Sequence, residues 1–572
     1  MEEKKKRIAI LGGGPSGMFV YKRLAESGRN DFEVTVFERN NQLGAGMPYS
    51  HDGANREHVT NVSDNEIPEI VTSIEEWIHT APKKFLEPFD IEPENFNEYK
   101  VLPRLLFGSY LSAQFGLLIE NAKKAGITTH VHLNSQVTDI IDEPKSGRVV
   151  IHVEGNKPET FDNIIICTGH NWPLKHEGKI PGYFDSPYPP SKLELTTDHP
   201  VAIKGASLTA IDAIRTLSRH NGTFETDKNG KVIFHLSPDS RNFRIVMHSR
   251  NGMLPAIRFH LDDSHLTNDS VLTQDEISNA RTENDGFLSL DFIFDRNFKE
   301  LFRKKDPAFY ERIKDWPMEQ FVDSMMELRD RLEPFQLFKA EYAEAERSIK
   351  NHQSIYWKEM LAVLSFAMNY PAKYLSAEDM QRLQKVLMPL IAMVIAFVPQ
   401  SSAKELLALY EAGILDLVSV GEDSAAEPES DGGATYSYAD EHNDSKSVYY
   451  KTFINCVGQP HLAYEDFPFK SLRENKTVSP ARIKFRFPEK AVAAIAAGNK
   501  DVVIENGNYY LKVPGISIND QFRVLDPLGA YNERIYIMAV PYIGGYNPDY
   551  SGLDFCEEAS QRIVDSLFDK IN

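Results

Sequence analysis

The chain opens with two strand-like runs separated by an amphipathic stretch. Residues 8–11 are apolar, residues 33–37 are rich in β-branched and aromatic side chains, and helical spacing between them is kept by Met18, Tyr21, Leu24 and Ala25. Short apolar runs predict strands, whereas apolar positions three and four apart predict one face of a helix. The pattern therefore predicts a strand, a helix that ends near Gly28, and a second strand.

The same order returns after residue 200. Residues 201–204 form a strand-like run, residues 244–249 form another, and one apolar helix face between them is made by Ile211, Ile214 and Leu217. Repeated strand–helix–strand units predict parallel sheets. Near the C-terminus, residues 534–540 predict a strand and the spacing of Phe555, Ala559, Ile563 and Leu567 predicts a helix.

The middle of the chain differs from both units. Residues 273–412 carry charged and aromatic side chains at helical spacing, with prolines as breakers, which predicts a helical insertion into the second unit. Such an insertion can form the wall of a substrate cleft, and a packing or dimer surface is an equal alternative. Residues 421–447 are acidic and rich in small residues, so we expect a mobile loop there.

The turn after the first strand indicates a ligand. Gly12 permits a tight turn, Gly14 lets the backbone approach a pyrophosphate, and Gly17 lets the helix pack close to the strand. Glu38 follows about 20 residues after the last glycine, where a carboxylate accepts from ribose hydroxyls and repels a ribose phosphate. With strand, helix and acid in order, the pattern predicts FAD or NAD rather than NADP, and disfavours a glycine turn without a ligand.

The second unit carries a degraded form of this fingerprint. Gly205 is kept, but Ser207 and Ala210 stand where the other two glycines are expected. Alanine suits the helix-packing position, whereas Ser207 either crowds the pyrophosphate or donates to it. The second strand ends in Ser249 and Arg250, a hydroxyl and a cation that suit a ribose phosphate, which favours NADPH over NADH. A structural unit that has lost its nucleotide remains the alternative.

Composition narrows the function classes. The chain has 572 residues, a net charge of −20 and three separated cysteines, which disfavour a nucleic-acid partner, a disulfide framework and a zinc site. The start leads directly into the first strand, so we expect no signal peptide and a cytoplasmic protein. The apolar run 386–398 is shorter than a membrane span and contains Pro389, and it predicts a buried helix rather than a membrane contact.

Several motifs together resemble the bacterial FAD/NAD(P)-binding flavoproteins related to flavin-containing and N-hydroxylating monooxygenases. The first is Gly-Gly-Gly-Pro-Ser-Gly at 12–17, and the others lie at residues 43–50, 58–62, 102–111, 167–170, 205–212 and 249–252. A strand ending in Cys167-Thr-Gly-His170 is similar to the exit from the FAD domain of such proteins, and residues 454–458 resemble a second crossing of this kind. The resemblance covers nearly the first half of the chain.

The expected fold is α/β, with two Rossmann-like dinucleotide-binding domains for FAD and NAD(P)H and a helical insertion. The resemblance implies that the segment with Gly44, Gly46 and Met47 wraps the FAD pyrophosphate, that Asn61 lies near the isoalloxazine, and that Arg104 lies near the cofactor. A plain turn, a capping Asn and a surface charge are the alternatives. The expected domains are 1–199 (FAD), 200–272 (NAD(P)H), 273–412 (insertion), 413–450 (NAD(P)H return with the mobile loop) and 451–572 (FAD).

The candidate cofactor-binding residues form one set, and no catalytic or metal-binding residue is assigned. They are Gly12, Gly14, Pro15, Ser16, Gly17, Glu38, Arg39, Gly44, Gly46, Met47, Asn61, Arg104, Thr168, Gly169, Gly205, Ser207, Leu208, Thr209, Ser249 and Arg250.

The activity implied is that of an FAD-dependent, NADPH-using monooxygenase. It would hydroxylate a small nucleophilic substrate with molecular oxygen, and N-hydroxylation of an amine or amino acid is the specific expectation. Baeyer–Villiger enzymes carry a phenylalanine-glycine-histidine signature between the two nucleotide units. The corresponding residues 180–190 have no histidine, which argues against a Baeyer–Villiger activity. An oxidoreductase that inserts no oxygen and a flavin-binding interaction protein with an inactive second site are the alternatives, and a homodimer is left open.

Overall fold

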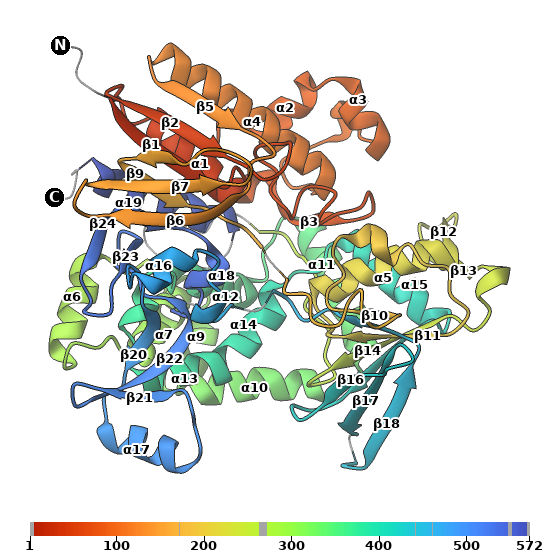
Figure 1. The fold of residues 1–572 in the computed structure, drawn as a ribbon. Coiled ribbons are helices and arrows are strands. Elements are labelled where there is room, and N and C mark those ends of the chain that lie inside the picture. Colours follow the sequence, from red (N-terminus) through yellow and green to blue (C-terminus); the bar gives the residue numbers. More distant parts are fainter. Residues whose placement is uncertain are drawn as a thin grey trace.

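The computed structural model describes residues 5–170, 172–261, 271–440, 442–459, 461–546 and 552–568. Two parallel sheets organise the chain, and the insertion lies beside them (Figure 1). The α/β class with two Rossmann-like units and a helical middle domain is thereby confirmed. Within the described residues, no helix combines the length and apolarity needed to cross a membrane.

The first sheet has the strand order β23-β24-β9-β1-β2-β5, and all its neighbours are parallel except the pair β23 and β24. Its strands are β1 (Lys6–Leu11), β2 (Phe32–Phe37), β5 (Thr128–His132), β9 (Asn163–Ile166), β23 (Arg523–Leu525) and β24 (Tyr531–Ile537). Ile10 lies opposite Val36 on one side and Ile165 on the other. All three are fully buried, as expected for a parallel sheet covered on both faces.

Helices and short strands complete the first domain. The C-terminal helix packs closely on α1, so the two ends of the chain build one nucleotide-binding unit. These elements are α1 (Pro15–Ala25), β3 (Val59–Ser63), α2 (Ile74–Thr80), α3 (Lys83–Leu86), β4 (Val101–Pro103), α4 (Arg104–Lys124), α16 (Lys470–Glu474), α17 (Pro488–Ala496), α18 (Val540–Ile543) and α19 (Gly552–Leu567). Two antiparallel sheets are added by β6 (Val137–Glu143), β7 (Arg148–Val153) and β8 (Glu159–Phe161), and by β20 (Pro480–Lys484), β21 (Val502–Glu505) and β22 (Asn508–Ile516).

The second sheet has the order β10-β19-β11-β14-β15, with every pair parallel. Its elements are β10 (Tyr183–Phe184), β11 (Pro200–Lys204), α5 (Leu208–Asn221), β14 (Arg244–Ser249), α15 (Gln400–Glu411), β15 (Leu415–Ser419) and β19 (Thr452–Asn455), with the hairpin β12 (Gly222–Thr226) and β13 (Val232–Leu236). Helix α15 lies within the expected insertion 273–412 and packs on the second nucleotide unit. Its Leu406 and Leu409 share a core with Leu217 of α5.

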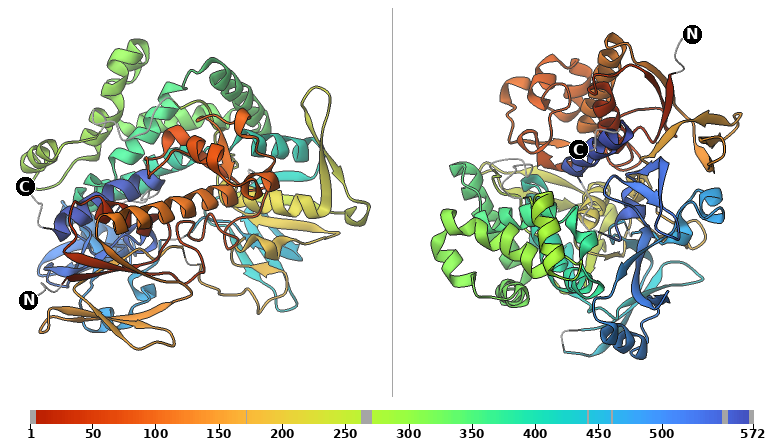
Figure 2. Two further views of the ribbon diagram at one scale, coloured as in Figure 1. Left: turned by 90° about the horizontal axis from the view of Figure 1, so that it is seen from above. Right: turned by 90° about the vertical axis from the view of Figure 1, so that its left-hand side faces the viewer.

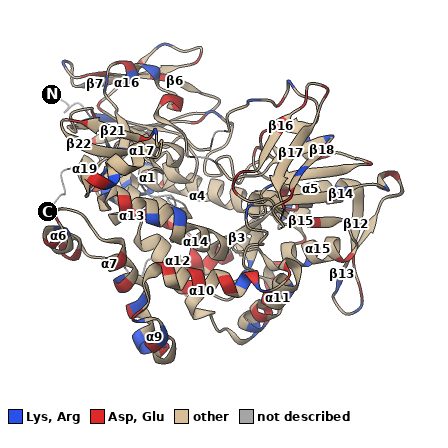
Figure 3. Cartoon of the chain, turned by 90° about the horizontal axis from the view of Figure 1, so that it is seen from below, with Lys and Arg blue, Asp and Glu red and all other residues tan. Residues whose placement is uncertain are grey.

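The insertion is helical, as expected. It consists of α6 (Gln274–Glu283), α7 (Leu290–Phe294), α8 (Glu300–Lys305), α9 (Pro307–Ile313), α10 (Met318–Asp330), α11 (Pro334–Asn351), α12 (Tyr356–Ala367), α13 (Ala377–Arg382) and α14 (Met388–Ile395). Its Phe298 and Leu361 share one core with Ile537 and Ile563, so it packs on the C-terminal part of the first domain (Figure 2). Both signs of charge occur on α6 and α9 (Figure 3). The apolar run 386–398 contains the buried helix α14, as expected.

The expectation of a mobile loop at residues 421–447 is wrong. This region belongs to a three-stranded antiparallel sheet of β16 (Ala425–Pro428), β17 (Ala434–Ala439) and β18 (Ser445–Tyr450). Ala434 and Tyr436 are buried, and the Tyr436 ring stacks on His248 at the end of β14 with 4.2 Å between ring centroids. Burial of alternate residues against the second sheet orders a segment whose acidic composition had indicated a loop.

A buried ion pair joins the two nucleotide domains. The guanidinium of Arg104, at the start of α4, pairs with the carboxylate of Asp212 in α5. The Tyr188 hydroxyl donates to the same carboxylate at 2.8 Å. Burial opposes the charge on Asp212, but the neighbouring Arg104 and His58 outweigh it and hold the pKa of the carboxyl below its usual value. A second buried pair, Arg258 with Glu66, crosses the same boundary.

We predict that Arg104→Met destabilises the protein by about 3 kcal/mol, because removing one partner leaves a buried charge uncompensated. Urea or thermal unfolding of the holoprotein measures this difference. The matched control is Arg331→Met, since Arg331 pairs with Glu327 and both side chains are more than half exposed. It should change stability by less than about 0.5 kcal/mol. Equal losses in the two variants would rule out a special role for the buried pair.

Candidate functional site

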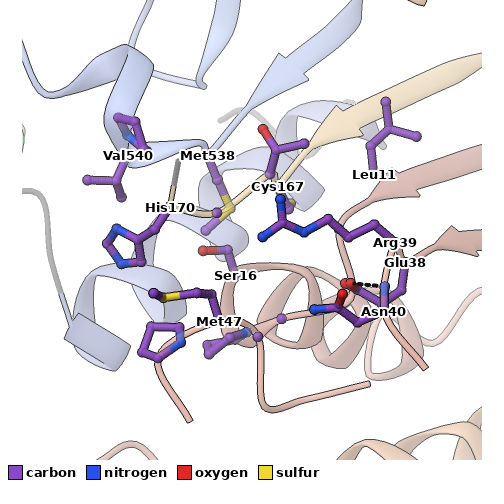
Figure 4. A pocket seen from close by; sticks show the side chains of 18 of the residues that line it. Leu11, Ser16, Glu38, Arg39, Asn40, Met47, Cys167, His170, Met538 and Val540 are labelled. Atoms are coloured by element: carbon purple, nitrogen blue, oxygen red, sulfur yellow. Dashed lines mark hydrogen bonds between the residues drawn. The ribbon is translucent and has the colours of Figure 1, made fainter. Parts of the chain in front are cut away.

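A cavity of about 430 Å³ opens at the carboxyl ends of β1, β2 and β9 (Figure 4). Its walls come from the glycine turn, the end of β2, the segment after residue 45, and the residues that follow β5, β9 and β24. The start of α19 completes it. Ten of the sequence-predicted residues line it, namely Gly12, Gly14, Pro15, Ser16, Glu38, Arg39, Gly46, Met47, Thr168 and Gly169.

Close backbone contacts explain the glycine turn. Gly12 has φ of +109°, and a Cβ atom there would lie 2.5 Å from the Cys167 carbonyl oxygen. A Cβ on Gly17 would lie 2.0 Å from the Gly12 carbonyl oxygen, so only glycine lets α1 pack this closely. Within the described residues, no side chain caps the N-terminus of α1. Its first N–H groups are therefore available for an anion such as a pyrophosphate.

Glu38 is fixed by its own backbone neighbours. One carboxylate oxygen accepts from the Gly13 N–H at 2.7 Å and the other accepts from the Asn40 N–H at 2.8 Å. These two bonds hold the buried carboxylate beside the glycine turn, and each oxygen keeps a lone pair for a ribose hydroxyl. Glu38, Arg39 and Asn40 lie at one end of the cavity, opposite His170 and Val540 (Figure 4).

The cavity fits FAD in its size and chemistry. Its volume falls in the range of about 300–1,000 Å³ that is usual for cofactor pockets. The end away from Glu38 is lined by apolar side chains, including Met47, Met538 and Val540, which suits a flat aromatic ring. The Thr168 hydroxyl oxygen on the wall is buried and has no hydrogen-bond partner among the described residues. Buried hydroxyls normally have a partner, so an occupant with a polar edge would satisfy it.

Four of the residues predicted for the FAD site do not line this cavity. Gly17 supports helix packing, while Gly44 donates its N–H to the Gly13 carbonyl at 2.7 Å and lies against the backbone of α4. The Asn61 carbonyl accepts from Arg258. The guanidinium of Arg104 lies outside the cavity lining and pairs with the Asp212 carboxylate of the second domain.

Sequence reasoning also missed part of the wall. Gln136 and Val137 follow β5, Met538 follows β24, and Cys556 lies in the first turns of α19 with its Sγ 3.5 Å from the Ser16 hydroxyl. Residues that follow parallel strands gather at one edge of a sheet, so the strand predicted near residues 534–540 was the available signal. Nothing in the sequence marks residues 128–132 as a neighbour of β2.

The second glycine turn has the same form as the first. Gly205 has φ of +111° and donates to the His248 carbonyl at 2.9 Å, just as Gly12 donates to the Phe37 carbonyl at 2.8 Å. A Cβ on Gly205 would lie 2.9 Å from the Cys456 carbonyl oxygen. Ser207 precedes α5 with φ −95° and ψ −168°, close to the −76° and −166° of Gly14 before α1. The degraded fingerprint thus keeps the backbone geometry of a nucleotide turn.

This equivalence places Ser249 where the first unit has Glu38. The Ser249 hydroxyl donates to the Asn251 side-chain oxygen at 3.0 Å. Arg250, the counterpart of Arg39, is exposed, and its guanidinium has no ion-pair or hydrogen-bond partner within the described part of the chain. Leu208 and Thr209 form the first turn of α5, which no side chain from the described part of the chain caps. The second turn therefore offers free N–H groups and a cation and, at the position equivalent to Glu38, no carboxylate.

Comparisons with known proteins match two separate parts of the chain, the start of the first domain and the helical insertion. Residues 9–171 match the family model described as FAD-NAD(P)-binding, and residues 273–395 match the YdhS-like middle domain. The uncharacterized protein YdhS of Escherichia coli K12 is 29% identical over 485 residues, which are 82% of this chain and 86% of YdhS. The flavin-containing monooxygenase ustF1 of Aspergillus flavus is 26% identical over 278 residues, 47% of this chain and 59% of that protein.

Among solved structures, the ornithine N-hydroxylase KtzI of Kutzneria sp. 744 is similar over 99% of both chains, with 14% identity and a TM-score of 0.45. The match to the YdhS-like middle domain ends at residue 395, just before α15. The chain is therefore similar to FAD/NAD(P)-binding flavoproteins over its first domain, and its helical insertion is similar to the YdhS-like middle domain.

Proposed function

We propose that the chain is an FAD- and NADPH-dependent monooxygenase that hydroxylates a small nucleophilic substrate with molecular oxygen. The nitrogen of an amine or amino acid is the expected acceptor. One observation carries the proposal: two nucleotide turns of the same backbone form occur in one chain, the first with an acid and the second with Ser-Arg at the ribose position. The 26% identity to a flavin-containing monooxygenase supports the oxygen-inserting reaction over simple reduction.

The first turn and the cavity beside it would hold FAD. Glu38 would accept from a ribose, the N-terminus of α1 would face the pyrophosphate, and the Thr168 hydroxyl would find its missing partner on the flavin. Bound FAD supplies the redox chemistry, accepting a hydride from a nicotinamide and delivering electrons to oxygen. The side chains position the cofactor and exclude water, because the walls around Met47 and Met538 are apolar.

The second turn would hold NADPH. A ribose phosphate carries about two negative charges near neutral pH and needs donors rather than an acceptor. The Arg250 guanidinium would provide such donors at the end of β14, and the Ser249 hydroxyl would add one by turning away from the Asn251 side-chain oxygen. NADH offers ribose hydroxyls instead, and the carboxylate that would accept from them is missing from this position.

Anaerobic mixing tests the proposal first. The purified yellow holoprotein should lose its visible flavin absorbance when NADPH is added, and much more slowly with NADH. Oxygen is then admitted with a panel of amines and amino acids, and mass spectrometry should detect a product heavier by one oxygen atom. Reduction without any hydroxylated product would favour the oxidoreductase, and no reduction by either nucleotide would reject both activities.

We predict that Gly17→Ala weakens FAD binding at least tenfold and yields largely colourless protein. The new Cβ would lie 2.0 Å from the Gly12 carbonyl oxygen and force the turn apart. The matched control is Gly116→Ala, also in a helix, where a Cβ meets nothing within 4 Å. It should keep its FAD and gain about 0.5–1 kcal/mol of stability. Flavin fluorescence during dialysis measures the affinity.

We also predict that Ser249→Glu reverses the nucleotide preference. The new carboxylate would stand at the position of Glu38, accept from the ribose of NADH and repel the phosphate of NADPH. The ratio of kcat/KM for NADPH over NADH should fall at least tenfold, measured by flavin reduction. Arg250→Gln should weaken NADPH alone, whereas Arg244→Gln, at the opposite end of β14, should leave the ratio unchanged. If the ratio of kcat/KM for NADPH over NADH is unchanged in Ser249→Glu, this end of β14 does not contact the ribose of the nicotinamide cofactor.

A further inference from the structure

The two domains touch where their central strands end. We name residues 167–170, after β9, and residues 456–459, after β19, the exit turns. They are equivalent, because the Cys167 N–H donates to the Leu11 carbonyl at 2.8 Å and the Cys456 N–H donates to the Lys204 carbonyl at 2.8 Å. Three residues after each cysteine, His170 and Gln459 therefore occupy matching positions in the two units.

These matching side chains bind each other. The imidazole Nδ1 of His170 and the side-chain oxygen of Gln459 form a hydrogen bond between the two domains. Burial lowers the pKa of His170, so its ring is neutral near pH 7. Because the amide oxygen can only accept, Nδ1 carries the proton and donates. His170 also lines the FAD cavity, beside Met47 and Val540 (Figure 4).

Two aromatic side chains link the His170 ring to the second domain. Trp172 lies 5.6 Å from it between ring centroids, and Tyr188 lies 5.1 Å from Trp172. The Tyr188 hydroxyl donates to Asp212 in α5, the helix that begins at the second nucleotide turn. A chain of contacts therefore runs from the wall of the FAD cavity to the helix of the second nucleotide unit.

We propose that the His170–Gln459 hydrogen bond positions the nicotinamide against the flavin, with Gln459 as a positioning residue that acts through His170. The inference rests on the proposed function, since it assumes that a nicotinamide reduces the flavin. In open parallel sheets, ligands lie over the carboxyl ends of the strands. The reactive ends of the two cofactors must therefore meet where the exit turns of β9 and β19 meet.

The rate of hydride transfer is sensitive to small shifts of the nicotinamide relative to the flavin. The reacting atoms must come within about 3–3.5 Å, and a displacement of about 1 Å can cost roughly 100-fold in rate. The hydrogen bond joins one wall of the flavin site to the strand end that carries the nicotinamide. Its loss would leave each cofactor bound in its own domain but badly placed relative to the other.

The test uses Gln459→Leu in the FAD-loaded protein, with anaerobic stopped-flow reduction by NADPH. The limiting rate at saturating NADPH should fall at least tenfold, while the half-saturating NADPH concentration and the FAD content change less than threefold. His170→Asn keeps a donor near the position of Nδ1 and should be reduced faster than His170→Leu, which has none; equal rates in these two variants would overturn the role of the hydrogen bond. Gln336→Leu, on the exposed face of α11, is the matched control and should behave as wild type.

Outcomes separate this inference from the proposed function. If the wild-type protein is reduced and Gln459→Leu is reduced equally fast, the positioning role is overturned and the function stands. If neither NADPH nor NADH reduces the wild-type protein, the function itself fails. Should Gln459→Leu not retain FAD, Gln459→Asn replaces it, since its shorter amide stays polar but no longer reaches Nδ1. The same fall in limiting rate is expected there, and a wild-type rate would overturn the role.

Discussion

The arrangement of the molecule depends on a pair of opposite charges buried between two domains. Neither Arg104 nor Asp212 can be desolvated alone at tolerable cost, so the low-energy state is the one in which both domains are docked and the charges meet. Arg258 with Glu66 repeats the constraint on the same boundary, and Lys373 with Asp520 ties the insertion to the first domain. Buried pairs of this kind specify an arrangement more than they add stability.

This docking brings together two nucleotide units that share one turn geometry but carry different residues in it. In both, a glycine lies under the carbonyl of a neighbouring strand and an uncapped helix begins three residues later. What differs is the residue at the end of the second strand, Glu38 in one unit and Ser249 in the other. The geometry of both turns suits a dinucleotide, and under the proposed function this one position sets which ribose is preferred.

The sequence was sufficient for features with a local cause. Periodicity indicated both strand–helix–strand units and the helical insertion, and Gly12, Gly17 and Glu38 are required by backbone geometry within one unit. The partner of Arg104 lies 108 residues away and could not be inferred from its neighbours. The sheet of residues 425–450 was missed for a related reason, since its strands are joined by acidic turns and are ordered by Tyr436 packing on His248 of a distant strand.

The two turns also differ in what lies over them. A Cβ on Gly14 would stand 3.1 Å from the Cα of Gly46, because the segment after Leu43 crosses the first turn, whereas Ser207 in the second turn is exposed. The segment after Leu43 thus favours glycine in the middle of the first turn whether or not a ligand is bound, whereas the exposed position of Ser207 accepts a side chain. A search that requires three glycines will pass over the second turn, although its backbone keeps the geometry of the first. The missing glycine is therefore no sign that the turn has lost its shape.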